Sequence, residues 1–553
     1  MKRMLVLTLI VLTLVALAAP TAFAQAPAPK VTINGLIDNV TSYSQNIANY
    51  NTGVFNRKDS LWYARARGRF DIIGEVGKAK GVIGFEMDLA YGQTGSRDSS
   101  VAPAGATTGT AVQQAFATNG GFDLNTDVGG GQLELKWLYV EFPVPLIPVP
   151  TTARVGAQSF GAAATYKLAT YATGDFAGVN VTSQVTPNLK VLATYVQAEE
   201  NLVGTGTRSG LPAAGVAPTQ NRGDDFAYIL SAEITPFKGL DIKPVFSMFY
   251  AAGTTSGPFG SRQGRGGVNI TTAYTNPDGT SHGGINEYRY TVGADARLRM
   301  GPFSFDPTVL YQFGSRTVVG PQATTAIIGP AFVSSGAVPG RKYYANIDAW
   351  LIDLRAGFQL GPLLIEGLGM YTTGNRARNN TLGTVRYFQV LDADTGYLSD
   401  WGTQLTSLGL DYQNALNEAS TRVAYPGNTI GWDKYGRAQI GLKATYAITP
   451  ALSAMAGANG HWTAQEVDRN GIPVAGAGIV PTFTGNRPRD GSRYVGTELM
   501  ALVSYRFAPG LVWDNAAGYM FMGEALDAVT DPTLGGRNTN NPFIYTSRLR
   551  FTF

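Results

Sequence analysis

The 553-residue chain contains no cysteine and only two histidines, His282 and His461. Without cysteine there is no disulfide framework, no thiolate ligand and no C-x-x-C-H site for haem attachment. Two isolated histidines do not make the cluster of ligands that a zinc site needs. The sequence therefore predicts no metal, no cofactor and no catalytic constellation. Asp/Asn-rich stretches such as "FDLNTDVGGG" could hold Ca²⁺, but most such stretches are solvated turns.

Long hydrophobic runs are also missing, apart from one near the N-terminus. Lys2 and Arg3 precede the apolar run at residues 4–19, and the small-residue site Ala22-Phe23-Ala24 follows it. This layout is typical of a secretory signal peptide. The alternative is a membrane anchor, but the run is short of the roughly 20 residues that a spanning helix needs. We predict a signal peptide at residues 1–24 and one domain at residues 25–553.

A strong excess of charge of either sign is absent as well. The formal net charge is +4, and removal of Lys2 and Arg3 lowers it by two, so no nucleic acid or other bulk polyanion is indicated as a partner. Mean hydropathy is −0.03. A soluble core of this size would show long apolar runs or split into domains, and the sequence shows neither pattern.

What the sequence does contain is apolar residues at every second position. The stretches "LWYARARGRFDI" and "GVIGFEMDLAY" each place apolar residues on one face and charged residues on the other. A hairpin centred on Gly77 and Lys78 would match the two faces, and such opposed pairs contribute about 0.2–1 kcal/mol each. The predicted pairs are Phe70 with Phe85, Ile72 with Ile83, Arg69 with Glu86, and Arg67 with Asp88.

The breaks between these alternating segments fall into two length classes. Eight are short, among them "GEVGKAKG", "TPNL", "LGPL" and "APGL", and nine are long polar stretches rich in Gly, Asn and Thr. Eight short and nine long breaks separate 18 alternating segments, which implies 18 strands. The stretch at residues 374–434 is long enough to hide another hairpin, so the range is 16 to 20. The long stretches are residues 44–58, 93–131, 161–173, 200–223, 252–284, 315–344, 374–434, 465–492 and 524–542.

This sorting of turns by length has a physical explanation. Backbone groups in hydrocarbon must all be paired, and a sheet achieves this only by closing on itself. Outer-membrane barrels combine short periplasmic turns, long outer loops, an apolar exterior and a polar interior. A soluble β-sandwich or solenoid is the alternative, and it would turn the apolar face into a core. We predict an all-β, closed antiparallel transmembrane β-barrel with short periplasmic turns and long extracellular loops.

The last residues, "RLRFTF", carry a resemblance to a family. Leu549, Phe551 and Phe553 resemble the C-terminal signal by which the barrel-assembly machinery recognises Gram-negative outer-membrane porins, members of the β-barrel porin superfamily. The pair "LKWLYVEF" and "ARVGAQSF" is also similar to a porin hairpin, with Ala157 where a basic residue is common. The resemblance implies that the protein lies in the outer membrane of a diderm bacterium, in contact with lipid and lipopolysaccharide. It also implies that the last strand pairs with the first at residues 31–38, and it allows a homotrimer.

On each strand the charged residues occupy alternate positions and so share one face. This face must point into the barrel, because Arg or Lys at the lipid midplane costs about 2–4 kcal/mol. Rings of charge inside a pore set its ion preference. Mutual neutralisation across the barrel is the alternative role for these charges. The predicted pore-lining residues are Arg65, Arg67, Arg69, Glu86, Asp88, Arg297, Arg299, Arg355, Arg437, Lys443, Arg506, Arg548 and Arg550.

Three functions fit such a barrel. The first is a porin that passes small hydrophilic solutes and ions by diffusion. The second is a dedicated conduit, either for polysaccharide export or as a sheath for a multihaem cytochrome, and a lumen of one sign would favour it. The third is a structural or adhesive surface barrel. If the last strand closes on the first, Arg548 and Arg550 join the arginines of residues 65–69 on one wall, which predicts a weak preference for anions.

Overall fold

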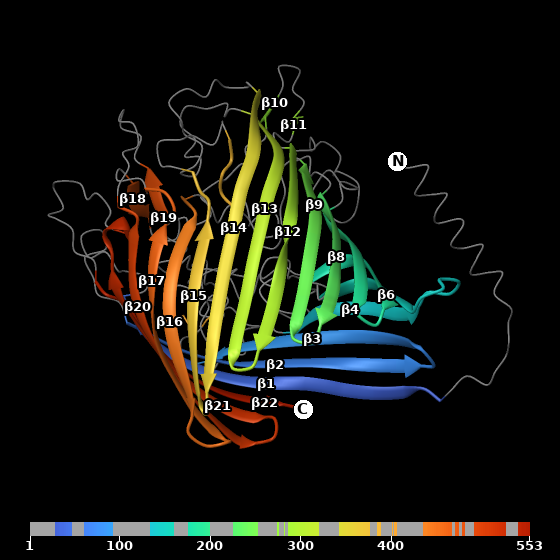
Figure 1. Cartoon of the computed structure of the whole chain (residues 1–553), viewed down its shortest axis with the longest axis horizontal. Helices are drawn as coiled ribbons and strands as arrows, with labels where there is room; N and C mark the ends of the chain where they lie inside the picture. Colours follow the sequence, from blue (N-terminus) through green and yellow to red (C-terminus); the bar gives the residue numbers. More distant parts are fainter. Residues whose placement is uncertain are drawn as a thin grey trace, which may run out of the picture.

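The protein is a single antiparallel sheet that closes on itself (Figure 1). The computed structural model describes residues 28–46, 60–91, 133–159, 175–199, 225–252, 274–275, 281–282, 286–319, 342–375, 384–388, 401, 403–405, 435–466, 471–474, 478–481, 492–526 and 540–553. The predicted signal peptide lies outside these residues. The sheet has 18 strands, each paired with its neighbours in chain order, so the predicted strand number is confirmed.

Two-stranded ribbons, β10–β11 (Tyr274–Thr275 and Ser281–His282) and β18–β19 (Gly471–Val474 and Gly478–Pro481), lie outside the main sheet. The 3-10 helix η1 (Glu524–Leu526) follows β21. In the described residues no helix is long and apolar enough to cross a membrane. The strands of the main sheet are β1 (Lys30–Gln45), β2 (Ser60–Val76), β3 (Ala79–Tyr91), β4 (Leu133–Pro143), β5 (Thr151–Ser159), β6 (Asp175–Thr186), β7 (Leu189–Glu199), β8 (Asp225–Phe237), β9 (Leu240–Ala252), β12 (Asn286–Met300), β13 (Phe303–Val319), β14 (Lys342–Leu360), β15 (Leu363–Thr372), β16 (Arg437–Ala447), β17 (Leu452–Thr463), β20 (Tyr494–Ala508), β21 (Leu511–Met522) and β22 (Phe543–Thr552).

All eight short breaks join consecutive strands of the sheet. The first, between β2 and β3, turns at Gly77 and Lys78, and Gly77 has a φ of 61° that an L-residue rarely adopts. The register that follows is the predicted one: Phe70 lies opposite Phe85 and Arg69 opposite Glu86, while the other two predicted pairs are also formed. The two phenylalanine rings are 5.3 Å apart. Alternation of side chains therefore fixed the register of this hairpin.

The seam between the first and last strands closes the barrel. β1 pairs with β22 from Leu36 opposite Thr552 to Gln45 opposite Phe543. Beyond the end of β22, the Gly35 amide donates to the Phe553 carbonyl at 2.9 Å, and the Phe553 amide donates to the Gly35 carbonyl at 3.0 Å. The predicted pairing of the last strand with the first is confirmed, but it uses residues 35–45 of the first strand and overlaps the predicted residues 31–38 only at 35–38. This pairing removes the free edges that an open sheet would expose.

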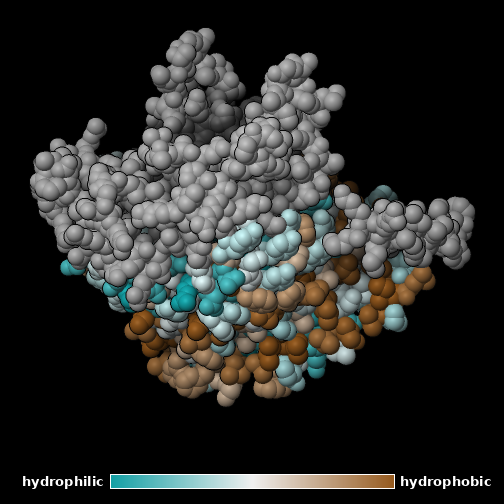
Figure 2. Space-filling view, turned by 90° about the horizontal axis from the view of Figure 1, so that it is seen from above, coloured by the Kyte–Doolittle hydropathy of each residue, from teal (hydrophilic) through white to brown (hydrophobic). Residues whose placement is uncertain are grey.

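Apolar side chains lie on the outside of the barrel and charged side chains on the inside, the reverse of a soluble protein. Large hydrophobic residues on the outer parity are exposed, for example Ile440 at 69% and Val31 at 67%, whereas Asp38, Arg289 and Glu498 on the inner parity are almost fully buried. Figure 2 shows hydrophobic residues gathered along the outer flank of the described strands. A β-sandwich would bury the apolar parity instead, so that alternative is wrong. The fold is that of a multi-pass β-barrel of the outer membrane.

Closure at the seam can be tested with a disulfide, because the chain has no cysteine. Ser42 lies opposite Thr546, and their hydroxyl oxygens are 2.9 Å apart. Directly opposed residues have Cα atoms about 4.5–5.5 Å apart, within the range that a disulfide spans. We expect Ser42→Cys with Thr546→Cys to cross-link on oxidation, so that the denatured, unreduced chain migrates faster in a gel than the reduced chain.

The matched control pairs Ser42→Cys with Thr552→Cys. Thr552 lies opposite Leu36, which places it about 20 Å along the strand from Ser42. No cross-link is expected in this control. Equal cross-linking of both pairs, or of neither, would contradict the described seam.

Candidate functional site

The inner face on either side of the seam carries a wall of ion pairs, which we call the seam wall: Asp514, Arg548, Arg550, Asp38, Arg67, Arg69, Asp71, Glu86 and Lys136, on β21, β22 and β1–β4. Arg548 donates to the Asp514 carboxylate at 2.6 Å, and Arg550 donates to Asp38 at 2.6 Å. Asp38 also lies directly opposite Arg67 in the pairing of β1 with β2. The arginines predicted on this wall are therefore brought together, and carboxylates lie between them.

Glu86 is the centre of the second half of the seam wall. Its carboxylate is 3.1 Å from Arg67 and 3.5 Å from Lys136, and it also accepts a hydrogen bond from Arg69. Glu86 and Arg67 are buried. One carboxylate that is shared by three cations satisfies the requirement that buried charges be paired.

A β-bulge places an additional cation on this wall. The register between β3 and β4 shifts between Gly84 and Phe85, and such a shift re-aims the side chains of the bulged strand. Lys136 is buried beside Glu86, while the next residue, Trp137, donates its indole N–H to Asp71 at 2.6 Å. Gly84 leaves the space for that indole, since a Cβ there would overlap it. Simple alternation does not predict two consecutive inward side chains.

The predicted residues elsewhere on the barrel are also paired or partly buried. Arg299 binds Asp306 through two nitrogens, with Nη2 to Oδ2 at 2.9 Å, and Arg355 binds Asp353 at 3.1 Å. Lys443 lies 3.3 Å from Glu366. Arg297 lies opposite Asp241 in the ladder. These pairs support the predicted alternative in which lumen charges neutralise one another.

Of the four remaining residues that were predicted to line the pore, two have side chains that the structure describes. Arg437 is buried near the start of β16, and Arg506 is exposed at the far end of β20, beside a bulge. Arg65 and Asp88 lie on described strands, but their side chains are outside the described part of the structure. That the predicted residues line an open pore stays a prediction.

The three residues of the predicted assembly signal lie on the outer face. Leu549, Phe551 and Phe553 are exposed, and the two phenylalanine rings are stacked 5.7 Å apart. Their role in assembly stays a prediction.

The first of two segments between β15 and β16 packs against the barrel at residues 384–388. Val385 pairs with the edge of β14, donating to Asn346 at 2.7 Å and accepting from Asp348 at 2.9 Å. Tyr387 is fully buried and accepts a hydrogen bond at its hydroxyl from Arg316, at 2.6 Å. The segment is therefore anchored on the inner side of β13 as well as at the β14 edge.

Behind Tyr387 lies a buried ionic cluster on β12 and β13, formed by Glu287, Arg289 and Arg316. The Glu287 carboxylate accepts from Arg289 at 2.7 Å and from Arg316 at 2.7 Å. Both guanidinium groups lie 5.8 Å from the Tyr387 ring, within the range of cation–π attraction. The cluster thus holds Tyr387 through charge, hydrogen bonding and ring contact together.

The second segment, residues 401 and 403–405, packs on β16, β20 and β21. The buried carboxylate of Glu498 accepts hydrogen bonds from the backbone amides of Gln404 and Leu405, the latter at 3.0 Å. Trp401 lies over Gly441, where any Cβ would overlap its ring, and the Lys443 ammonium is 4.9 Å from that ring. Glu498 acts on this segment as a capping carboxylate acts on a helix start.

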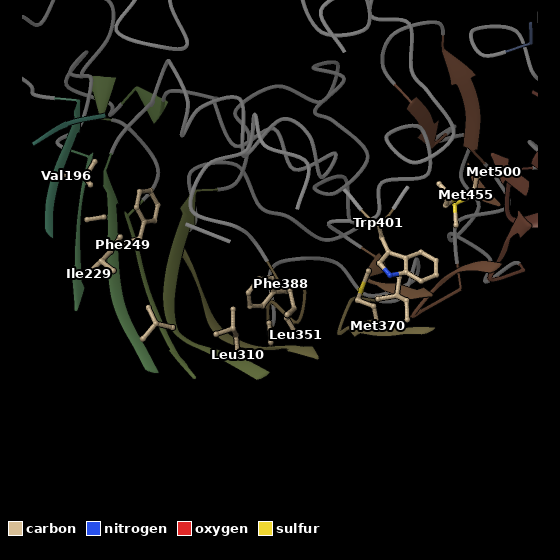
Figure 3. Packing of buried hydrophobic residues seen from close by; sticks show 14 residues of the cluster. Val196, Ile229, Phe249, Leu310, Leu351, Met370, Phe388, Trp401, Met455 and Met500 are labelled. Atoms are coloured by element: carbon tan, nitrogen blue, oxygen red, sulfur yellow. The ribbon is translucent and has the colours of Figure 1, made fainter. Parts of the chain in front are cut away.

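Where these segments pack, apolar residues lie on the inner face beside the ionic cluster and Glu498. Leu310 and Leu351 on the barrel wall are buried with Phe388, and Met370 is buried with Trp401 (Figure 3). The alternation pattern predicted a polar interior, and this part of the interior is an exception. The described pieces between β15 and β16 cover this part of the inner face.

For residues 374–434 the sequence predicts only that the stretch is long enough to hide another hairpin. The described pieces of it form no barrel strands and instead pack inside the barrel. The inward parity of Leu310, Leu351 and Met370 was the available signal, because apolar residues facing a lumen need something to cover them. That signal does not say which stretch covers them.

His461 faces inward, as the alternation predicts. Its Nε2 is 3.6 Å from Glu498, and both residues are buried. A lipid-facing histidine, which an outer-membrane phospholipase would require, is therefore not found at this position. Within the described residues, no group of three or more His, Cys, Asp or Glu side chains is arranged to hold a metal ion.

Comparisons with known proteins add a likeness of fold. A scan of protein-family models and a search of curated proteins gave no match. Solved structures that match include Pseudomonas aeruginosa OccK8 (OprE), at 11% identity and a TM-score of 0.44 over 95% of this chain and 98% of that one. A BenF-like porin from Pseudomonas fluorescens Pf-5 has 10% identity and a TM-score of 0.43 over 95% and 98% of the two chains. Acinetobacter baumannii OccAB1 has 10% identity and a TM-score of 0.42 over 94% and 96%. Sequence identities and TM-scores this low say nothing about the function of this chain.

The buried ionic cluster predicts a measurable stability difference. Glu287→Gln leaves two buried guanidinium groups without their shared counter-charge, and breaking a buried pair typically costs about 3–5 kcal/mol. Unfolding by urea in lipid vesicles should show this loss. The control is Glu75→Gln, because Glu75 pairs with Lys30 at 3.6 Å in an exposed position and should lose less than about 1 kcal/mol. Equal losses in the two variants would mean that the buried cluster stabilises the fold no more than an exposed ion pair does.

Proposed function

We propose that the protein is a porin, a passive channel for small hydrophilic solutes and ions in the outer membrane, and that it has no enzymatic activity. The observation that carries this proposal is the wall of paired charges on the inner face of a closed, 18-stranded barrel. Barrels of 16–18 strands are wide enough to hold an aqueous channel. Charged groups on an inner wall keep such a lumen wet, because they retain their hydration better than apolar side chains do.

The two segments between β15 and β16 are the proposed constriction of this channel. They are bound to the inner face by Arg316 on β13 and by Glu498 on β20, which lie on different parts of the wall. A channel that is narrowed on this side leaves the seam wall as the face along which solutes pass. The seam wall has partly exposed charges, Arg69, Asp71, Arg548 and Arg550, beside buried ones such as Glu86.

The ion preference of the channel is proposed to be weakly anionic. Among the described residues of the seam wall, five cations (Arg67, Arg69, Lys136, Arg548 and Arg550) face four carboxylates (Asp38, Asp71, Glu86 and Asp514). Because nearly every charge has a partner, the excess is small. Salt should reduce the preference further, since the Debye length falls from about 10 Å at 0.1 M to about 3 Å at 1 M.

The alternatives receive less support from the described residues. A conduit for one polyanion or for a cytochrome would favour a lumen of one sign, and the pairs on this wall are of mixed sign. An adhesive barrel would favour loops that project outward, and the described pieces between β15 and β16 pack inward. We also propose that lipid and lipopolysaccharide cover the exterior, that Leu549, Phe551 and Phe553 are read by the barrel-assembly machinery, and that a homotrimer is the assembly to test first.

The constriction can be tested by conductance in planar bilayers. Glu498→Ala removes an acceptor of two backbone hydrogen bonds, each worth about 1.5–3 kcal/mol when the acceptor is charged, so the segment should loosen and the single-channel conductance should rise. Gly441→Val should have the same effect, because the added side chain displaces Trp401.

The control for this measurement is Glu233→Gln. Glu233 is an inward carboxylate bound to Lys190 on β7 at 3.0 Å and to Lys243 on β9 at 3.1 Å, away from the strands that hold the inner segments. Its conductance should stay near that of the parent. If the parent protein shows no ion conductance, the porin proposal is wrong; if the parent conducts but neither variant conducts more, the constriction is elsewhere.

Ion selectivity is tested by the zero-current potential in a salt gradient. Replacement of Arg65, Arg67 and Arg69 by glutamine should shift this potential toward cations, because it removes positive charge from β2, the strand that carries Arg67 and Arg69 of the seam wall. Glu86→Gln should shift it in the opposite direction, since it removes the carboxylate that three cations share. A triple variant that keeps the selectivity of the parent would show that these arginines do not act on passing ions.

A further inference from the structure

One of the eight short turns differs from the others in length and composition. Seven residues separate β4 from β5, whereas four separate β16 from β17 and two separate the strands at each of the other six turns. The stretch "PVPLIPVP" at residues 143–150, which we call the proline turn, contains four prolines. No charged residue lies between Glu141 and Arg154, although the neighbouring turn between β2 and β3 carries the exposed Lys78.

The tip of the proline turn holds a large apolar side chain on a strained backbone. Leu146 has a φ of 68° and is 83% exposed, and the next residue, Ile147, is 43% exposed. A positive φ directly after a proline in a turn is normally adopted by glycine or asparagine, and it is unfavourable for a bulky residue. Strain at an exposed position such as Leu146 points to a contact that the side chain makes outside this chain.

The backbone of the proline turn has few hydrogen-bond donors. Its four prolines carry no N–H group, and the Val144 amide donates to the Thr151 carbonyl at 2.8 Å. The Val149 carbonyl accepts from the Thr151 hydroxyl at 3.0 Å, and the Pro150 carbonyl accepts from the Gln184 amide at 2.9 Å. Each unpaired backbone group is costly to move from water into hydrocarbon. The proline turn can therefore leave water at a smaller cost than an ordinary turn of its length.

The proline turn also continues the lipid-facing side of β4. Every second residue near the end of this strand is apolar and exposed on the outer face: Leu138, Val140 and Phe142. The next position in this alternation is Val144, inside the proline turn. Charged groups at the base of the turn lie on the inner side, where Glu141 is 2.7 Å from Lys80 and accepts from Arg154 at 2.8 Å. Apolar surface thus leads from the lipid-facing wall to the tip of the turn.

We propose that the proline turn inserts into the phospholipid leaflet at the short-turn end of the barrel and anchors the wall of β4 and β5 there. Lipid is the occupant that these features favour, because the apolar surface of the turn is continuous with the surface that already faces lipid. A backbone with few free donors also suits a medium that offers no hydrogen-bond partners. The inference rests on the barrel fold and is independent of the proposed channel.

The position of the tip can be measured with a fluorescent label, because the chain has no cysteine of its own. Leu146→Cys, labelled with an environment-sensitive dye, is placed in nanodiscs of phosphatidylethanolamine and phosphatidylglycerol. We expect its emission to shift to shorter wavelength than that of the control, to be quenched by nitroxide-labelled lipid and to be protected from iodide. The matched control is Lys78→Cys in the turn between β2 and β3, whose label should be quenched by iodide instead.

Leu146→Asn separates contact with lipid from backbone strain. Asparagine adopts a positive φ more readily than leucine does, so without a lipid contact this variant should unfold at a higher urea concentration than the parent in vesicles of the same two phospholipids. If the leucine side chain lies in lipid, the variant should unfold at a lower concentration. Lys78→Gln is the control and should unfold at the concentration of the parent.

Two outcomes would overturn insertion: a label at position 146 that iodide quenches as strongly as the label at position 78, or a Leu146→Asn variant that is more stable than the parent. Either would leave a periplasmic protein or a second copy of the chain as the partner of the proline turn. Heat-modifiable migration in gels shows that each variant is folded. Neither measurement uses ion conductance, so a failure of insertion leaves the porin proposal standing.

Discussion

The pairing of β1 with β22 is the interaction on which the rest of the structure depends. A sheet in hydrocarbon cannot leave an edge unpaired, because each unsatisfied backbone group costs several kcal/mol. The seam meets this requirement with a ladder from Leu36 to Gln45, extended by the two hydrogen bonds between Gly35 and Phe553. Once the sheet is closed, every strand has a lipid face and a lumen face. Alternate residues along the strand then face lipid or lumen, and this decides whether an apolar or a polar side chain fits each position.

Closure also changes what stabilises the interior. The inner face of a barrel this wide is too far from the opposite wall to be filled by side chains alone. The seam wall solves this by lateral pairing: Glu86 binds cations from β2 and β4, and Asp38 lies between Arg67 and Arg550. Pairs of this kind let charged residues remain close-packed along a wall while the lumen beside them stays polar.

On the other side of the barrel, the chain itself covers the wall. Glu498 and Arg316 each hold one piece of the connection between β15 and β16, and apolar residues such as Leu351 and Met370 pack beneath these pieces. The described inner face therefore has one part on which these pieces pack, where apolar residues lie beside the ionic cluster and Glu498, and another part formed by the seam wall. The proposed channel and its constriction follow from this arrangement.

The sequence by itself determined the strand number and the register of the β2–β3 hairpin. Both depend on the alternation of side chains and on turn length, which are local properties that a single sequence displays. Closure of the last strand on the first was implied by the resemblance of the final residues to a family signal, and the structure places this pairing at residues 35–45 of the first strand. Tertiary structure alone decided which charges share a partner, as Arg67, Arg69 and Lys136 do at Glu86. It also decided the bulge that turns both Lys136 and Trp137 inward, and the packing of residues 384–388, 401 and 403–405 inside the barrel. These features depend on contacts between residues far apart in the chain, and a period-two pattern carries no information about such contacts.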